Sequence, residues 1–477
     1  MIKKQRGIAV ALGLLAAGAC SDITVPDYRD PPLENLLNNP SVEDILKTST
    51  GVLQGTRQDS DTYVRFTGIT GREGYFLDPN EPRYVTAIYN GTPSAGNFTG
   101  SSYWTTPFRN IRTANVLIAG LDKVEMPAAD EEAIRGLAKT IQAVDYLQLL
   151  NTRAKIPVQV NTSLDSLFYP APLVERDVAF THISNLLDEA QGHLQKAGEN
   201  FPFPMPSGFS QFGFNKPAKF IQFNRALKAR VEVYRATLTT TRDAARYQAA
   251  LTALGQSFIT TTGAVDPVTD RTLLNLGAYQ TYSGNSGDTP NTLSDVSGKT
   301  VAEPKLRTDA ELRANGQRDA RYVAKIDSTS ASSLVGGLSS NLRFAHYTTR
   351  PFYGGGGLAS PIPIIRNEEL ILLRAEARWF TGDKVGAMAD LNFIRVNSGG
   401  LQPAATPATD AAFITELLAQ RRYSLLFEGG HRWIDFRRFG LRTSLPATGT
   451  PRALATPSFG NSAEYFPLPN NEANARL

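Results

Sequence analysis

Apolar residues recur every three or four positions over several long segments, and this spacing constrains the fold of the chain more than any other feature. Such spacing places the apolar side chains on one face of a helix, and that face must be buried against another element. Successive helices of this kind, joined by short breaks, pack as antiparallel pairs. The sequence therefore predicts a mainly α protein with little β structure, with helices over residues 108–121, 134–150, 180–194, 223–238, 367–380, 384–396 and 410–427.

Local signals set the ends of the C-terminal helices. Asn367 is expected to cap the helix that runs to about Phe380, because an asparagine side chain accepts a hydrogen bond from a free amide of the first turn. The last clear helix is expected to end at about Phe427, before two glycines. These helix pairs resemble tetratricopeptide-type hairpins, although the sequence has no strict repeat of about 34 residues.

Four long segments between the periodic ones are rich in Gly, Ser, Thr, Asn and aromatic residues. Long loops on a helical frame are usually functional. The run Gly354 to Gly357 lies in the last of them, and we interpret it as a flexible loop, because no Lys-Ser/Thr pair follows it as a phosphate cradle would require. These poorly helical segments are 55–106, 198–217, 255–305 and 327–362.

The N-terminus has the features of an export signal. Lys3, Lys4 and Arg6 precede a 13-residue uncharged run that ends in Ala17-Gly18-Ala19-Cys20. The run is too short to span a bilayer as a helix. Small residues directly before a cysteine resemble the bacterial lipoprotein signal, which implies a signal peptide over 1–19, lipidation of Cys20 and a tether over 20–33. The alternative is an ordinary signal peptide with an incidental cysteine.

The composition excludes several classes of protein. Of the 477 residues, 41% are hydrophobic and 20% are charged, which is not the balance of a disordered chain. The single cysteine can form neither an internal disulfide nor a cysteine zinc site. Basic residues (49) barely outnumber acidic ones (45), so no nucleic-acid partner is indicated. Removing residues 1–19 removes three basic residues and no acid, so +4 becomes +1, which suits an uncharged ligand.

Long C-terminal motifs carry a more specific resemblance. The segments PIPIIRNEELILLRAEARWFTGDKVGAMADLNFIRVNSGG (361–400), ELLAQRRYSLLFEGGHRWIDFRRFG (416–440) and YFPLPNNE (465–472) are similar to those of the SusD/RagB family of outer-membrane lipoproteins. Upstream, residues 103–118, 138–150 and 156–157 resemble the early helices of that family. With the lipid signal, the resemblance covers nearly all of the chain.

This resemblance implies both a fold and a function. It implies one helical body, with a tetratricopeptide-like N-terminal part (34–255) packed on a C-terminal part (256–477). It also implies a lipid-anchored protein at the outer surface of the outer membrane, which captures glycans for a SusC-like TonB-dependent barrel without cleaving them. The alternatives are capture of peptides or another polymer, and a protein-binding scaffold without its own ligand site.

The charged residues of the motifs are expected to be structural. Charges spaced by three or four positions along helices usually form ion pairs, and arginine offers a planar fork that suits carboxylates. We expect these residues to connect the C-terminal helices rather than to form an active site: Glu376, Arg378, Trp379, Arg395, Arg421, Arg422, Glu428, Arg432, Trp433 and Asp435.

An enzyme is not indicated. A glycosidase needs two carboxylates facing a cleft, and Glu368, Glu369 and Asp435 lie within helical segments with charge partners nearby. The four histidines form no metal-binding pair, and neither a G-x-S-x-G motif nor a free thiol supplies a nucleophile. We therefore expect no catalytic residue, no metal and no cofactor.

A glycan site is expected on the aromatic residues of the loops. Sugar rings present C–H faces that stack on aromatic side chains, while amides and arginines bind the hydroxyls. Trp104 and the Phe-rich stretch 201–214 are expected to be packed, the latter in the core or against the barrel. The predicted platform consists of Tyr75, Tyr84, Tyr89, Tyr279, Tyr282 and Tyr353, with Phe352 and Arg350 beside the last.

Overall fold

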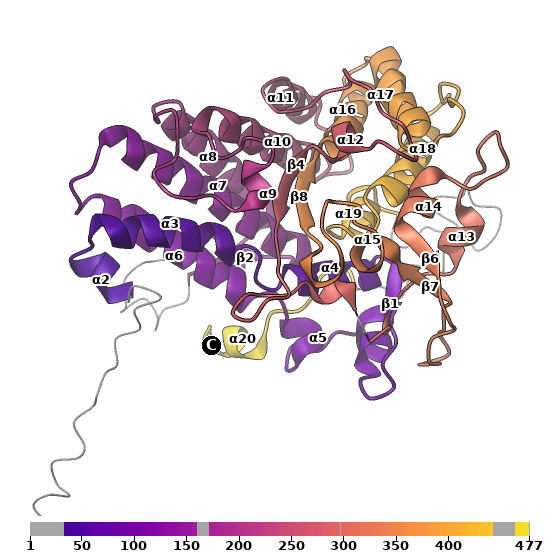
Figure 1. Ribbon diagram of the computed structural model, residues 1–477, viewed down its shortest axis with the longest axis horizontal. Coiled ribbons are helices and arrows are strands. Elements are labelled where there is room, and N and C mark those ends of the chain that lie inside the picture. Colours follow the sequence, from indigo (N-terminus) through magenta and orange to yellow (C-terminus); the bar gives the residue numbers. More distant parts are fainter. Residues whose placement is uncertain (1–32, 160–170, 296, 442–462, 477) are drawn as a thin grey trace, which may run out of the picture.

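The segments with the strongest apolar periodicity form the long helices of the protein (Figure 1). The computed structural model describes residues 33–159, 171–295, 297–441 and 463–476. Helices dominate these residues and the strands are short, so the prediction of a mainly α fold is confirmed. The proposed signal peptide, Cys20 and almost all of the proposed tether lie outside the described residues.

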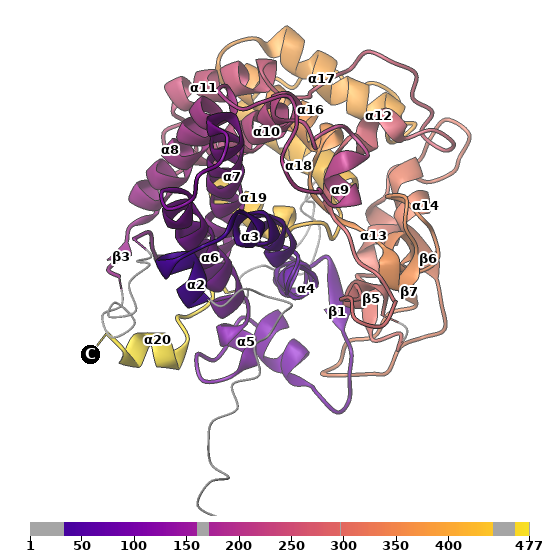
Figure 2. The ribbon, with the colours of Figure 1, turned by 60° about the vertical axis from the view of Figure 1, so that its left-hand side comes forward.

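Most of the long helices pack on the next one along the chain, whereas α4 contacts α19 near the C-terminus (Figure 2). Gly136 on α7 allows a close approach to α8, because a side chain there would overlap Leu194. The long helices are α3 (Val42–Gly55), α4 (Ser60–Thr70), α6 (Thr105–Leu121), α7 (Ala128–Thr152), α8 (Arg176–Leu194), α10 (Pro217–Arg235), α11 (Ala244–Gly255), α16 (Asn367–Phe380), α17 (Lys384–Asn397), α18 (Asp410–Ser424) and α19 (His431–Arg438).

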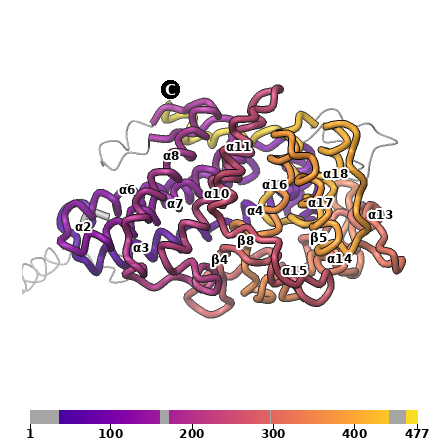
Figure 3. The backbone as a smooth tube through the Cα atoms, turned by 90° about the horizontal axis from the view of Figure 1, so that it is seen from above, coloured from indigo at the N-terminus to yellow at the C-terminus, as the bar shows by residue number. Residues whose placement is uncertain are grey.

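One continuous series of contacts joins the two ends of the molecule. α7 lies between α6 and α8, α10 contacts α8 and α11, and both α10 and α11 contact α16, which pairs with α17. Seen from above, α2 and α3 lie near one end and α13, α14 and α18 near the other, with α10 and α16 between them (Figure 3). Among the described residues, none of the helices is long and apolar enough to cross a bilayer.

Short helical turns punctuate the remaining segments. Several of them follow or precede a strand and fix the direction of a loop, as α12 does just before β4. They are α2 (Leu33–Asn38), the π-helix η1 (Tyr84–Tyr89), α5 (Phe98–Ser101), α9 (Ser207–Ser210), α12 (Thr272–Asn275), η3 (Thr292–Ser294), α13 (Lys305–Asp309), α14 (Ala320–Lys325), α15 (Ala345–Thr348), η4 (Gly357–Ala359) and α20 (Asn470–Asn474).

The strands form antiparallel pairs that fasten the long loops to the helical frame. The pair β4–β8 matters most for the site, because it joins α12 to α16, with Gly277 opposite Arg366 and a bulge at Ala278/Tyr279. The pairs are β1 (Gly74–Phe76) with β5 (Thr300–Ala302), β2 (Ile156–Pro157) with β3 (Leu173–Val174), β4 (Gly277–Gln280) with β8 (Ile362–Arg366), and β6 (Ile326–Ser328) with β7 (Leu342–Phe344).

Two local predictions were wrong. Residues 55–106 were expected to be poorly helical, yet α4 lies there and is almost entirely buried, so tertiary packing overrides the low helix propensity of its Ser, Thr and Asp residues. Asn367 does not cap α16, whose N-cap is Arg366. The Asn367 side chain instead accepts from the Thr260 amide (2.9 Å) and donates to the Thr260 carbonyl (2.8 Å), which ties another loop to the helix.

Trp104 and four of the five phenylalanines of the stretch 201–214 are packed in the core, while the fifth, Phe212, is half-buried. Phe201, Phe209 and Phe214 are buried against α10, and Phe220 and Phe223 of that helix contact the stretch edge to face or at a tilt. Trp104 is also buried. The expectation of core packing at these positions is therefore confirmed.

Candidate ligand-binding site

The predicted tyrosine platform is not at the surface. Five of its six rings are buried, at 4% (Tyr75), 9% (Tyr89), 1% (Tyr279), 7% (Tyr282) and 6% (Tyr353) exposure. The sixth, Tyr84, is half-buried, with its ring centroid 4.3 Å from that of Phe76 and 5.2 Å from that of Phe98.

Their hydroxyl groups are also engaged by the protein. Tyr279 donates to the carbonyl of Asn275, Tyr282 donates to the carbonyl of Arg57 (3.1 Å), and Tyr353 donates to the carboxylate of Glu428. A stacking surface needs ring faces open to solvent, and burial removes those of the five. The candidate site is therefore moved from these rings to a neighbouring pocket.

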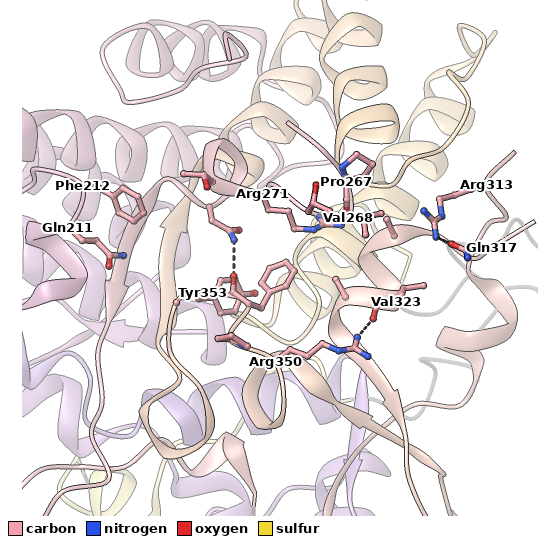
Figure 4. Close-up of a pocket in the computed structure, with 18 residues that line it drawn as sticks. Gln211, Phe212, Pro267, Val268, Arg271, Arg313, Gln317, Val323, Arg350 and Tyr353 are labelled. Carbon is pink, nitrogen blue, oxygen red and sulfur yellow. Dashed lines mark hydrogen bonds between the residues drawn. The ribbon is translucent and has the colours of Figure 1, made fainter. Parts of the chain in front are cut away.

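That pocket has a volume of about 640 Å³ and is formed by four segments far apart in the sequence: 211–212, 267–275, 313–324 and 350–354 (Figure 4). Two of them belong to the long loops 255–305 and 327–362, and they meet beside α12 and α14. Figure 4 shows Phe212 on one side of the pocket, Arg271 in its middle, and Arg313 with Gln317 on the other side.

Phe352 supplies an aromatic surface of the pocket. It is half-buried, whereas the adjacent Tyr353 is anchored inward by its hydrogen bond to Glu428. A tight turn presents Phe352, since its amide donates to the Arg350 carbonyl (2.8 Å) and the Gly354 amide to the Pro351 carbonyl (3.2 Å). Gly354 closes this turn with φ +100°, a conformation that favours glycine. The turn thus holds one ring in the core and the next at the pocket.

Asn275, at the end of α12, links the two loops. Its side-chain amide donates to the Phe352 carbonyl (2.9 Å), while its Oδ1 atom is buried with no hydrogen-bond partner among the described residues. A buried polar atom without a partner costs free energy, and Asn275 lines the pocket, so its Oδ1 atom is a candidate acceptor for a ligand hydroxyl. Asn275 therefore both supports the aromatic turn and offers a recognition group.

Arginines give the pocket its charge. Arg271 donates to Ser398 (2.9 Å to the carbonyl and 3.1 Å to the hydroxyl) and to the Pro267 carbonyl. Arg313 donates to the Arg318 carbonyl (2.9 Å) and to Gln317. Burial lowers the pKa of Arg271, although Glu368 opposes the shift. Arg350 is paired with Asp327.

The charged C-terminal motif lies elsewhere and is structural, as expected. Arg421 pairs with Asp435 (2.5 Å), Arg395 pairs with Glu416 (2.5 Å), and Glu376 binds Arg438 (2.9 Å). The remaining members also bind within the protein: Arg422 pairs with Asp309, Arg378 with Asp390, Trp379 donates to Asp410, Trp433 donates to Ala463, and Arg432 lies over Phe436.

Glu428 is the centre of a separate group of buried charges. Burial alone would raise its pKa, but Arg366 and Lys325 lower that pKa to about 2. Arg366 contacts both carboxylate oxygens of Glu428 (2.9 and 3.0 Å) and also binds Glu368. We call this cluster of Arg366, Lys325, Glu368 and Glu428 the buried ion cluster.

Two other hollows fit a glycan less well. The one of about 680 Å³ near Arg437 contains Tyr465, and the guanidinium groups of Arg176 and Arg437 lie over that ring at 4.9 and 4.7 Å. Phe352 also has cations over its ring, but they lie farther away, with Lys325 at 5.0 Å and Arg271 at 5.5 Å. The one of about 500 Å³ beside Met205 contains Arg57, which is paired with Asp288. Its Tyr279 ring is buried.

Part of the pocket lining was predicted from the sequence. Phe352 and Arg350 were noted as loop residues, but Phe212, Arg271, Asn275 and Arg313 were missed. No local signal distinguishes these residues, because they become neighbours only when the four segments meet.

Comparison with known proteins agrees with this architecture. The model of the SusD family matches residues 277–475. A SusD-like protein from Bacteroides fragilis has the same fold, with a TM-score of 0.67 over 93% of this chain and 98% of its own, at 15% identity. Residues 277–475 therefore match the SusD family, and the chain has the fold of SusD-like proteins. No curated protein sequence matches it.

Two further SusD-like structures are similar. A SusD-like carbohydrate-binding protein from Bacteroides fragilis has a TM-score of 0.61, with 15% identity, and covers 85% of this chain and 90% of its own. A laminarin-binding SusD-like protein has a TM-score of 0.57, with 17% identity, and covers 91% of this chain and 97% of its own. At these identities the similarity establishes the fold alone.

Proposed function

We propose that this SusD-like protein is an outer-membrane lipoprotein that binds oligosaccharides in the pocket beside Phe352 and delivers them to a SusC-like TonB-dependent barrel. The observation that carries the proposal is the pocket itself. It combines a half-buried ring with amide and guanidinium groups, the combination that recognises sugar faces and hydroxyls. Two similar structures are those of a carbohydrate-binding and a laminarin-binding protein.

Binding without cleavage is part of the proposal. Hydrolysis of a glycosidic bond uses a pair of carboxyl groups across the scissile bond. Among the described residues, the pocket lining includes no Asp, Glu, His or Cys side chain, and no group of three or more potential metal ligands is found. The lining therefore supports a binding role.

Attachment and partner are proposed from the sequence and the family. We propose that residues 1–19 are a signal peptide, that Cys20 carries the lipid at the end of the 20–33 tether, and that the 34–255 and 256–477 parts form one body outside the cell. Replacing Cys20 with Ala is expected to release the protein from the outer-membrane fraction. Retention of Cys20→Ala in that fraction would disprove the anchor.

Calorimetric titration of the chain from Ser21 onward tests the ligand class. Panels of oligosaccharides and of peptides are compared, and an oligosaccharide is expected to bind. Phe352→Ala should weaken its binding by about 1–3 kcal/mol, by analogy with the stacking of bases on aromatic rings. Phe393→Ala, which removes a half-buried ring on α17, is the matched control and should leave affinity unchanged. Binding of peptides alone would favour the peptide alternative.

A further inference from the structure

The charge of the pocket differs from the charge of the chain. Once residues 1–19 are removed, the side chains sum to about +1, which suits an uncharged ligand. Yet the described residues that line the pocket include Arg271, Arg313 and Arg350 and no carboxylate. The net charge of the whole chain therefore does not predict the local charge of the pocket, which is positive.

Arg271 and Arg313 are the pocket cations that lack a direct carboxylate partner among the described residues. Within the described part of the chain, both donate to carbonyl, hydroxyl or amide oxygens, and neither has a carboxylate within ion-pair distance. Arg350 differs, because Asp327 neutralises it. Glu368 and Asp319 attract Arg271 from beyond ion-pair distance, and their direct partners are Arg366 and Arg321. Ser398 lies between Glu368 and Arg271, and its hydroxyl donates to Glu368.

The carboxylates of the same loop are occupied by its own backbone. Asp266 accepts from the amides of Val268 (2.8 Å) and Thr269 (2.7 Å), and Asp270 accepts from the amide of Thr272 (3.0 Å). These bonds fix the turn that leads into α12. They leave the guanidinium groups as the charged groups facing the cavity among the described residues.

A partly buried cation without a counterion is costly, and an anion that reaches it recovers much of that cost. The planar guanidinium matches the two oxygens of a carboxylate or sulfate, and such charge-assisted bonds are about twice as strong as neutral ones. Phe352 lies within reach, with its ring centroid 5.5 Å from the Arg271 guanidinium carbon. Aromatic and anion-binding groups therefore share one cavity.

We propose that the ligand is an acidic oligosaccharide, whose uronate carboxylate or sulfate ester is bound by Arg271 and Arg313 while a sugar ring contacts Phe352. This inference rests on the proposed oligosaccharide function and adds the class of sugar. Uronates and sulfated sugars supply the same chemistry, so the test includes both.

The test is calorimetric titration of the chain from Ser21 onward with oligomers of galacturonate, glucuronate and mannuronate. Each is paired with its carboxyl-reduced neutral form, and sulfated galactose oligomers are included. At least one acidic oligomer should bind about tenfold more tightly than its neutral counterpart. That advantage should shrink as NaCl rises from roughly 0.05 to 0.5 M, because salt screens charge pairs.

Arginine variants locate the effect. Arg313→Gln at the rim should remove most of the preference for acidic over neutral oligomers, and Arg271→Gln should do the same where the loop stays folded. Arg109→Gln is the matched control, because Arg109 on α6 likewise donates to a glutamine (Gln58, 3.2 Å) and lies outside this pocket.

The outcomes separate this inference from the function on which it rests. Neutral oligomers that bind as tightly as acidic ones, with affinity lost in Phe352→Ala, would overturn the acidic ligand and keep the proposed function. An acidic preference that survives both Arg313→Gln and Arg271→Gln would overturn the assignment to these arginines. Failure of every oligosaccharide to bind would overturn the proposed function itself.

Discussion

Two groups of arginines in this protein differ in their surroundings: one is buried and ion-paired, and the other lines the pocket. Arg366 is fully buried in the ion cluster and contacts Glu428 and Glu368 directly. Arg271 and Arg313 lie only partly buried at the pocket, and within the described residues they are not ion-paired. The number of arginines in a region therefore does not indicate where a ligand binds. What distinguishes Arg271 and Arg313 here is that no described protein carboxylate lies within ion-pair distance of them.

Substituting one arginine from each group tests this difference most strongly. Arg366→Met should lower the free energy of unfolding by about 3–5 kcal/mol, because it leaves two buried carboxylates with Lys325 as their remaining close cation. Arg313→Gln should change that free energy by no more than about 0.5 kcal/mol. Denaturant unfolding measures both.

Equal effects in these two variants would contradict the division. A small loss in Arg366→Met would mean that the buried ion cluster does not hold the C-terminal helices together. A large loss in Arg313→Gln would mean that this arginine supports the fold.

The two aromatic positions of the pocket region give a second comparison. Tyr279 is buried on β4, so Tyr279→Ala should cost about 3–5 kcal/mol of stability by leaving a cavity. Phe352→Ala should cost less than half as much, because its ring is partly exposed. Thermal and denaturant unfolding of the two variants check this order, and the reverse order would restore Tyr279 as a surface residue.

Acid should act on the buried ion cluster and its neighbour His346. Burial, aided by Lys325, lowers the pKa of His346 to about 3, from about 6.5 in an unfolded chain. The unfolded chain then binds more protons, so stability is lost as the pH falls from about 6.5 toward 3. For one such group, the free energy of unfolding falls by up to about 1.4 kcal/mol for each pH unit.

The carboxylates of the cluster act in the same direction at lower pH. Burial opposes the shift, but Arg366 and Lys325 lower the pKa of Glu368 to about 2, as they do for Glu428. Their contribution is present above about pH 4.5 and is lost toward pH 2. Unfolding measured from pH 7 to 4 should show a shallower slope in His346→Gln than in the parent chain. An unchanged slope would contradict a neutral buried His346.

The helical part of the fold could be predicted from the sequence, because periodicity reports one buried face. Residues 134–150 lie within α7, and residues 180–194 lie within α8. α4 was missed because it is buried on nearly all sides, so its sequence shows neither a polar face nor high helix propensity. A helix that is buried on every side has no polar face, so the spacing of its apolar residues does not reveal it.

The site could be predicted only in part. The sequence shows that aromatic residues lie in the long loops, but it does not show which of them are buried. Tyr279 lies on a strand that is buried on both faces, whereas Phe352 lies on a turn that projects it to the pocket. Arg271 and Asn275 have no local sequence signal, because they line a pocket only together with Phe352, which lies about 80 residues further along the chain. That Arg271 and Arg313 lack a direct carboxylate partner is known only once the distances between charged groups are known.

The central claim is that the pocket beside Phe352 holds the ligand. A crystal structure of the chain from Ser21 onward, soaked with the tightest-binding oligosaccharide of the titration panels, tests it most directly. The account predicts a sugar ring against Phe352, a hydroxyl at Asn275 Oδ1 and an anionic group at Arg271 or Arg313. Density for the sugar in the hollow beside Arg57 and Met205, with this pocket empty, would contradict it.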